Sequence, residues 1–305
     1  MLINPEIRSM LGQEATFQAT EPVDSGKIRR FAKALGLDDP RYFDLAKDLP
    51  IAPLIFVFSV NHDSLGGVDE SGRPTNRLSL PPPFGPAIRG GNKFQFFRPV
   101  QVGDRIQIYR KITDLKEKQG SQGPLVFLTY DLKYTNQNED LLGINNETLI
   151  FQVVQDRGEG QGKDKREENK PSFKINAGQE IPSFQTKVSK VQMMMYAAAT
   201  WNPYQLHWDS DYSREHGFPD ANIAGPMFGA YLSEMLARWA GNPSKLKSLE
   251  YKNRAMAFPG DTLICKGQVR GQYNEGDKSY WDCQVWMENQ ECCRLVEGSA
   301  AVTRS

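Results

Sequence analysis

The sequence predicts an α+β fold in which helices pack on an antiparallel sheet, and it predicts that this unit is built twice. Two observations support the fold class. Apolar segments with helical spacing come early in each half of the chain, and long segments of alternating polarity follow them. A third observation supports the duplication, because the two halves repeat one another at an offset of about 165 residues.

The first predicted helix of each half shows the repeat most clearly. Residues 24–35 align with residues 189–200, and each segment begins with a residue type that caps helices. In the second segment, Ser189 and Gln192 have the spacing of a capping box. We therefore expect a short helix at the same place in both halves.

The second predicted helix of the C-terminal half begins near Pro226. Proline suits the first position of a helix, and Gly241 suits the position just past its end. Between them, apolar residues recur on one face at helical spacing, which is typical of core packing. They are Met227, Tyr231, Leu232, Met235, Leu236 and Trp239.

Strands with alternating polarity follow the helices in each half. Asn- and Gly-containing turns separate them, which is typical of an antiparallel meander. The predicted strands are residues 93–114, 124–135 and 141–155 in the first half, and residues 249–272, 279–288 and 291–303 in the second.

A charged, glycine-containing stretch separates the halves. Its residues 156–170 include no apolar side chain that a core would bury, so it should be a solvated linker. We predict an N-terminal repeat at residues 1–155, a linker at 156–182 and a C-terminal repeat at 183–305.

Composition excludes several classes of protein. Lys plus Arg and Asp plus Glu are 37 each, so the formal net charge is zero, unlike that of a dedicated nucleic-acid binder. The first residues lack the charged and apolar regions of a signal peptide, and the longest apolar run, residues 49–60, is too short to span a bilayer. We expect neither nucleic acid nor a membrane as a partner.

All four cysteines lie after residue 264, in sequence that is typical of strands. Cys292 and Cys293 are adjacent, so on a strand they would point to opposite faces, which argues against a zinc site. Together with Cys265 and Cys283 they indicate reduced, structural cysteines of a cytoplasmic protein.

The candidate reactive group is His207, the best placed of three histidines. It follows an apolar helix and an Asn-Pro turn, and histidine is the side chain whose ordinary pKa suits proton transfer near neutral pH. Gly225 lies shortly afterwards, at the predicted start of a helix, where an N–H can polarise a carbonyl oxygen. Because Pro226 has no N–H, the donor must be Gly225 or a neighbour such as Met227. This combination points to chemistry on a carbonyl compound.

These motifs resemble the MaoC-type hydratases and dehydratases, in the double hot-dog branch whose N-terminal domain is similar to a fatty-acid-synthase dehydratase and to which mesaconyl-C4-CoA hydratases belong. In the second half the resemblance is carried by Thr200-Trp-Asn-Pro-Tyr-Gln-Leu-His207-Trp-Asp209, by residues 212–219, by Ala224-Gly-Pro-Met227 and by residues 259–261. In the first half it is carried by residues 31–36, 38–42, 97–99 and 103–104.

The resemblance implies two repeats, each an antiparallel sheet wrapped around a central helix, and reversible addition of water to a 2-enoyl thioester. It implies that His207 is the general base and acid, that Asn202 orients the water and that the Gly225 N–H polarises the thioester carbonyl. It further implies an acyl-CoA or acyl-carrier-protein substrate, a homodimer, and no metal or other cofactor. Gln205, Tyr204 and Met227 are expected to contact the substrate.

The sequence departs from the family pattern at two places. Thr200 stands where relatives carry a catalytic aspartate, and Ala224 stands where relatives often carry a histidine. Thr200 and Asp209 are candidates for the second polar group, although Asp209 also has the position of an N-cap. In the first half Tyr42 falls opposite His207, and because a phenol is a poor base at neutral pH, this half should only shape the pocket.

Three functions therefore stay open at this point. The first is an enoyl-CoA hydratase or (R)-3-hydroxyacyl-CoA dehydratase acting on a short or carboxylated chain, for which Gln205, Asn202 and Arg89 offer polar contacts. The second is a non-catalytic thioester-binding or assembly subunit, which the two departures favour. The third is a thioesterase on the same fold.

Overall fold

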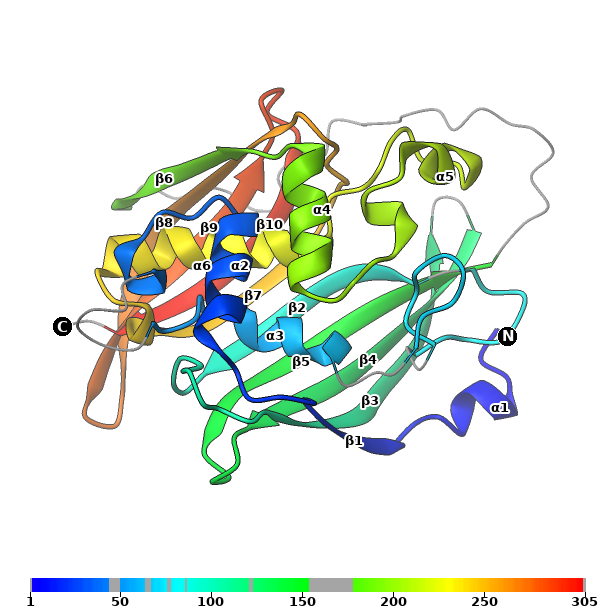
Figure 1. Ribbon diagram of the computed structural model, residues 1–305, viewed down its shortest axis with the longest axis horizontal. Helices are drawn as coiled ribbons and strands as arrows, with labels where there is room; N and C mark the ends of the chain where they lie inside the picture. The colour runs from blue at the N-terminus through cyan, green and yellow to red at the C-terminus, as the bar shows by residue number, and fades with distance from the viewer. Residues whose placement is uncertain are drawn as a thin grey trace.

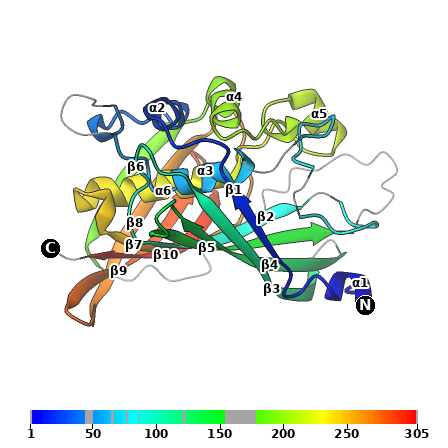
Figure 2. The ribbon, with the colours of Figure 1, turned by 60° about the horizontal axis from the view of Figure 1, so that its bottom comes forward.

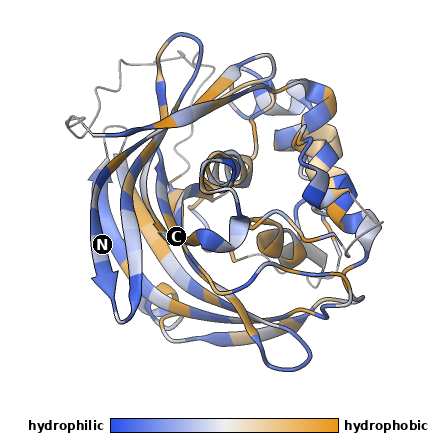
Figure 3. Ribbon diagram, turned by 90° about the vertical axis from the view of Figure 1, so that its left-hand side faces the viewer, coloured by the Kyte–Doolittle hydropathy of each residue, from blue (hydrophilic) through white to orange (hydrophobic). Residues whose placement is uncertain are grey.

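The computed structural model describes residues 2–43, 50–63, 67–75, 78–85, 87–120, 123–153 and 178–303. Its main element is a single ten-stranded sheet in which every pair of neighbours is antiparallel. The sheet curves around helices that lie on its concave face (Figures 1 and 3). The predicted α+β class is confirmed. Most of the predicted linker lies outside the described residues, and the proposed boundaries stay a prediction.

Apart from α1, α5 and η3, the elements of the two halves follow one another in the same order. The first half contains α1 (Pro5–Arg8), β1 (Glu14–Gln18), α2 (Ser25–Ala34), η1 (Pro40–Tyr42), α3 (Phe56–Asp63), β2 (Ile88–Phe96), β3 (Gln107–Gly120), β4 (Gly123–Thr135) and β5 (Leu141–Gln152). The second contains β6 (Glu180–Lys187), α4 (Lys190–Ala199), η2 (Gln205–His207), α5 (Ser210–Glu215), α6 (Gly225–Ala240), η3 (Pro243–Lys245), β7 (Leu246–Asn253), β8 (Thr262–Glu275), β9 (Lys278–Glu288) and β10 (Arg294–Thr303).

The strand order shows the duplication directly. Across the sheet the order is β1-β3-β4-β5-β2 for the first half and β7-β10-β9-β8-β6 for the second, so the halves mirror one another about the β2–β7 pair. Helices α2 and α4 begin at residues 25 and 190 and end at 34 and 199, an offset of 165 residues at both ends. The predicted internal repeat is therefore present in the structure.

Local sequence explains where the helices of the second half begin and end. The predicted capping box of α4 is present: the Gln192 N–H donates to Ser189 Oγ at 3.2 Å, and the Ser189 N–H donates to Gln192 Oε1 at 3.0 Å. Helix α6 has Pro226 in its first turn and ends at Gly241, whose φ of 73° is the left-handed conformation that glycine adopts without strain.

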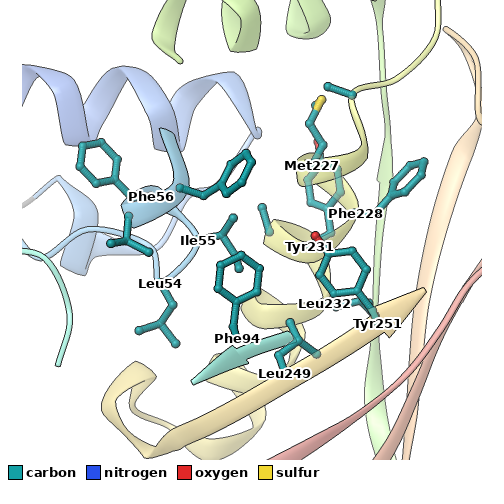
Figure 4. Close-up of a cluster of buried hydrophobic side chains, with 14 of the residues drawn as sticks. Leu54, Ile55, Phe56, Phe94, Met227, Phe228, Tyr231, Leu232, Leu249 and Tyr251 are labelled. Carbon is teal, nitrogen blue, oxygen red and sulfur yellow. The ribbon is translucent and has the colours of Figure 1, made fainter. Parts of the chain in front are cut away.

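The core lies between the sheet and helices α3 and α6, with α2, α4 and α5 forming an outer layer (Figures 1 and 2). Figure 4 shows side chains from the start of α3, from α6 and from strands β2 and β7 meeting in one buried cluster. The two central helices differ in length, because α3 has 8 residues and α6 has 16. The second half therefore contributes most of the helical surface that the sheet buries.

Two of the predicted strands were too long. Residues 93–114 fall in β2 and β3, and residues 249–272 fall in β7 and β8. Each pair is separated by a Gly-Asp turn: Gly103 and Gly260 have φ of 92° and 93°, and the following aspartates accept a backbone N–H three residues back at 2.8 and 2.9 Å. Alternating polarity continues across these turns, which is why the pattern predicted single strands.

The prediction that Cys292 and Cys293 lie on a strand was also wrong. They lie in a tight turn before β10, where the Cys292 N–H donates to the Asn289 carbonyl at 3.0 Å and Cys292 has a φ of 60°. All four cysteines are free thiols. Separately, none of the helices in the described part of the chain has the length and hydropathy that a membrane span requires.

A buried hydrogen bond joins the two halves beneath the sheet's central strands. The Tyr42 hydroxyl donates to Glu234 Oε2 at 2.7 Å, and both residues are almost fully buried. Glu234 also pairs with Arg238 one turn later in α6, and Arg238 bonds Asp38 of the first half at 2.7 Å. Burial beside this carboxylate raises the pKa of Tyr42, so the phenol stays protonated and keeps donating.

We expect Tyr42→Phe to lower the free energy of unfolding by about 1.5–3 kcal/mol, because it removes a buried hydrogen bond to a charged group. Urea denaturation of the purified chain measures this change. Tyr109→Phe is the matched control, since its hydroxyl bonds Gln107 at 2.9 Å on an exposed part of β3. Equal losses of unfolding free energy in the two variants would contradict a stabilising role for the Tyr42–Glu234 hydrogen bond.

Candidate active site

A recess at the end of α4 collects the residues that the sequence singled out. Its walls are Met193, Tyr196 and Ala197 of α4, Asn202 of the following turn, His207 of η2, and Ala224 and Met227 at the start of α6. These side chains lie close together, so the recess is a shallow depression and not an open cavity. The predicted residues His207, Asn202 and Met227 therefore share one recess, and Gly225 lies beside Ala224 at its edge.

Asn202 reaches the recess because α4 ends in a tight left-handed turn. The Asn202 N–H donates to the Ala197 carbonyl at 2.8 Å, and Trp201 adopts a φ of 50° between them. A left-handed tryptophan is strained, and such strain persists only where surrounding contacts determine the backbone. The Asn202 side chain is buried, and no group among the described residues donates to its Oδ1. Asn202 thus presents an unsatisfied acceptor at the recess.

The His207 ring is held by a backbone carbonyl. Its Nδ1 lies 2.8 Å from the Asn222 carbonyl oxygen, and because a carbonyl only accepts, Nδ1 must carry the proton. In the neutral ring this leaves the lone pair on Nε2, which is the form a general base requires. The Tyr204 ring packs edge-on against the imidazole at 5.8 Å and further limits its orientation.

The first turn of α6 offers one backbone donor to the recess. Its capping residue, Ala224, has no side-chain cap, Pro226 has no N–H, and the Met227 N–H donates to the Ala224 carbonyl at 2.9 Å. The Gly225 N–H has no acceptor among the described residues. At this helix start the Gly225 N–H is therefore the candidate donor, and Met227 lines the recess with its side chain.

Glycine is also favoured at position 225 by its neighbours. A Cβ placed there would lie 3.1 Å from Asn253 Nδ2 and 3.2 Å from Arg89 Cδ. Arg89 comes from β2 of the first half, and its guanidinium pairs with the buried Glu147 of β5. The first half thus contacts the oxyanion side of the recess without lining it.

Tyr196 is the polar side chain on the α4 wall of the recess. Burial is the main cause that raises its pKa, so its hydroxyl stays a neutral donor through the ordinary pH range. The Phe31 ring of α2 packs against it at 5.7 Å. Every residue that lines the recess nevertheless belongs to the second half, whereas the sequence had indicated that the first half shapes the pocket.

The structure keeps five of the candidate residues out of the recess lining: Gly225, which follows Ala224, and Thr200, Asp209, Tyr204 and Gln205. The Thr200 hydroxyl donates to the Tyr196 carbonyl at 2.7 Å and so closes the end of α4. Asp209 is the N-cap of α5, accepting from the Asp211 and Tyr212 N–H groups at 2.9 and 3.1 Å. Tyr204 packs on His207, and Gln205 is held through its backbone.

Residues that sequence reasoning missed include Met193, Tyr196 and Ala197. Their spacing of three and four residues places them on one face of α4, so the helical period could have grouped them once the turn was known. Asn222 acts through its carbonyl, and no side-chain pattern could have identified it. Among the described residues, no group of three or more His, Cys, Asp or Glu has the arrangement to hold a metal ion.

Comparisons with known proteins give a consistent result. Residues 9–142 match the family model of the FAS1-like dehydratase domain region, and residues 173–282 match the MaoC-like domain. A UPF0336 protein of Streptomyces coelicolor is 34% identical over 122 residues, which cover 37% of this chain and 76% of that protein. The mesaconyl-C(4)-CoA hydratase of Chloroflexus aurantiacus is 23% identical over 218 residues, covering 69% of this chain and 68% of that enzyme.

Solved structures with the same fold cover nearly the whole chain. A MaoC-like dehydratase has a TM-score of 0.74 at 15% identity, covering 98% of this chain and 99% of that one. A protein of Mycobacterium tuberculosis described as a double hotdog fold has a TM-score of 0.63 at 14% identity, covering 96% of both chains. The double hot-dog architecture is therefore confirmed.

The geometry predicts one tautomer of His207 near neutral pH: Nδ1 protonated and Nε2 carrying the lone pair. Proton–nitrogen correlation NMR on ¹⁵N-histidine-labelled protein distinguishes the two ring nitrogens. The three histidines make assignment by single substitutions practical. A neutral His207 with its proton on Nε2 would contradict the bond to the Asn222 carbonyl.

Proposed function

The chain belongs to the MaoC double hot-dog family, and from that premise we propose that it is a hydro-lyase acting on acyl thioesters. It reversibly hydrates a 2-enoyl-CoA to a (R)-3-hydroxyacyl-CoA. The observation that carries the proposal is the meeting of a proton acceptor and a carbonyl-polarising donor at one recess. His207 lines that recess, and Gly225 stands next to Ala224, which lines it as well.

Hydration begins with a water molecule between Asn202 and His207. The Asn202 Oδ1 lacks a protein donor among the described residues, so a water O–H is a suitable partner for it. His207 Nε2 takes the second proton of this water as its oxygen forms a bond to C3 of the enoyl chain. The Asn222 carbonyl stabilises the resulting imidazolium through Nδ1–H.

As the C–O bond forms, the electron pair of the double bond moves toward the thioester oxygen. The Gly225 N–H donates to this oxygen, and the positive end of the α6 dipole favours the developing negative charge. C2 then takes the proton from His207 Nε2, which regenerates the neutral base and completes the addition of H and OH. Dehydration is the reverse sequence through the same groups.

The acyl chain is proposed to be short or to carry a carboxyl group. Met193, Tyr196 and Met227 close the recess with bulky side chains, which favours a short chain. Burial keeps the Tyr196 hydroxyl protonated, so it can donate to a polar substituent. The proposal also takes a CoA or carrier-protein thioester as substrate, which the mesaconyl-C(4)-CoA hydratase relative supports. A homodimer, a cytoplasmic location, and repeats at residues 1–155 and 183–305 joined by a linker at 156–182 are proposed from the sequence alone.

A non-catalytic thioester-binding subunit is the second candidate. It is favoured by Thr200, whose hydroxyl bonds the α4 backbone, and by the absence of any carboxylate among the residues lining the described recess. A thioesterase is the third candidate. The three differ in what they do to an enoyl-CoA: hydration removes the conjugated double bond, hydrolysis releases a thiol, and binding alone does neither.

We expect the wild-type chain to remove the enoyl absorbance of crotonyl-CoA or mesaconyl-C4-CoA without releasing free thiol. His207→Ala should lower kcat by about 10²–10⁴-fold, because it removes the general base. Spectrophotometry with a thiol reagent in parallel measures both signals. Thiol release at the rate of absorbance loss would instead support the thioesterase.

His216→Ala is the matched control for this variant. His216 bonds the Tyr212 carbonyl through Nδ1 at 2.7 Å, as His207 bonds Asn222, but it is exposed and lies outside the recess lining. It should retain the wild-type rate within about two-fold. A His207→Ala variant that turns over at full speed would refute the proposed mechanism.

A further inference from the structure

A loop of the first half lies directly on the turn that carries the candidate base. Residues 67–75 belong to the connection between α3 and β2, and the Ser71 carbonyl accepts the Gln205 N–H at 2.9 Å. Gln205 is the first residue of η2, and His207 is the last. Among the described residues, this is the one backbone hydrogen bond from the first half to η2. It is made two residues before His207.

The turn needs this acceptor because its own sequence supplies no substitute. The leading N–H groups of a helix lack partners within it, and a capping side chain normally satisfies one of them. η2 has only three residues, and the side chain of its capping residue Tyr204 does not cap it. At the matching place in the first half, the Asp39 side chain caps η1 by accepting the Arg41 N–H at 3.0 Å. The Ser71 carbonyl performs a comparable role from another repeat.

Gly72 allows the loop to approach this closely. Its φ is 77°, and a Cβ placed on it would lie 2.1 Å from the Pro203 carbonyl oxygen and 3.2 Å from the Tyr204 nitrogen. Both the backbone conformation and the contact therefore exclude a side chain. The same Pro203 carbonyl accepts the Trp208 Nε1–H at 2.9 Å, so the side chain that follows His207 bonds the carbonyl that Gly72 faces.

The loop is itself rigid enough to hold the turn. Asp69 accepts the Ser71 N–H at 2.9 Å, the Ser71 hydroxyl at 2.7 Å and the Arg73 N–H at 3.0 Å. The hydrogen bond from the Ser71 hydroxyl is the largest cause that lowers the pKa of Asp69, which keeps it an acceptor at neutral pH. The Thr75 N–H closes the loop by donating to the Gly67 carbonyl at 3.0 Å.

We propose that Ser71 and Gly72 of the N-terminal repeat are positioning residues for the reaction at His207. They fix the start of η2 from outside the C-terminal repeat, so the repeat that lacks a base contributes to catalysis through backbone contacts. The effect of this role on kcat rests on the proposed hydratase function. The contact between the loop and η2 does not. It also gives the connection between α3 and β2 a defined function.

The test is Gly72→Ala in the full chain. The added methyl group forces the loop and the Pro203 carbonyl apart, which breaks or lengthens the Ser71–Gln205 bond. A displacement of about 1 Å in a catalytic group is enough to cost about 10²-fold in rate. We expect kcat for the enoyl-CoA to fall by about 10–100-fold while KM changes less than about three-fold. The thermal unfolding midpoint is recorded alongside, so that partial unfolding is recognised.

Two further glycine variants distinguish the contact between Gly72 and Pro203 from the effects of loop substitution and of backbone strain. Gly67→Ala lies in the same loop, where a Cβ meets nothing within 4 Å, and it controls for loop substitution. Gly103→Ala imposes a comparable left-handed strain at φ of 92°, again with nothing within 4 Å. Both should retain the wild-type kcat within about two-fold. Equal losses of kcat in Gly72→Ala and Gly103→Ala would overturn the positioning role.

A second measurement does not depend on activity. Hydrogen exchange followed by NMR should show a protected Gln205 amide in the wild-type chain, and Gly72→Ala should speed its exchange by at least about ten-fold relative to Gly67→Ala. An unprotected Gln205 amide in the wild type, or unchanged exchange in Gly72→Ala, overturns the inference. If the wild type shows no hydratase activity but Gln205 behaves as expected, only the proposed function fails.

Discussion

The organisation of this site depends on one constraint: backbone groups at helix ends must find partners outside their own helix. Three such ends meet here. The end of α4 turns through a left-handed Trp201 and brings Asn202 into the recess. The start of η2 takes its acceptor from Ser71, and the start of α6 leaves the Gly225 N–H without a protein acceptor in the described chain. The groups proposed for proton transfer and for carbonyl polarisation come from these three helix ends.

The internal duplication places equivalent residues at the same position in each repeat. Burial then determines the role of each residue. Tyr42 and His207 are both the last residues of three-residue 3₁₀ turns at the same place in their repeats. The Tyr42 hydroxyl is buried against Glu234 of α6, where its raised pKa makes it a permanent donor that joins the halves. His207 faces a recess, and its Nδ1 is bonded to a carbonyl. One copy thus joins the halves, and the other carries the proposed general base.

The first half also acts on the recess from outside it. Arg89 of β2 lies against Gly225, Phe31 packs on Tyr196, and Ser71 accepts from Gln205. These contacts approach three different sides of the site, yet none of the three residues lines the recess. A repeat without a base can therefore control the geometry of the neighbouring repeat, provided that the sheet pairing of β2 with β7 holds the two in register.

The sequence by itself determined the α+β class, the repeat, the capping box of α4 and the positions of His207 and Gly225 in the chain, because these follow from local patterns of capping, periodicity and turns. It could not divide β2 from β3 or β7 from β8, since alternating polarity runs through the Gly-Asp turns. Only the tertiary structure decided that Asn222 sets the His207 tautomer and that Ser71 and Gly72 contact the turn that carries His207. These contacts are made by backbone groups distant in sequence, and backbone groups are the same in every residue, so no pattern of side chains records them.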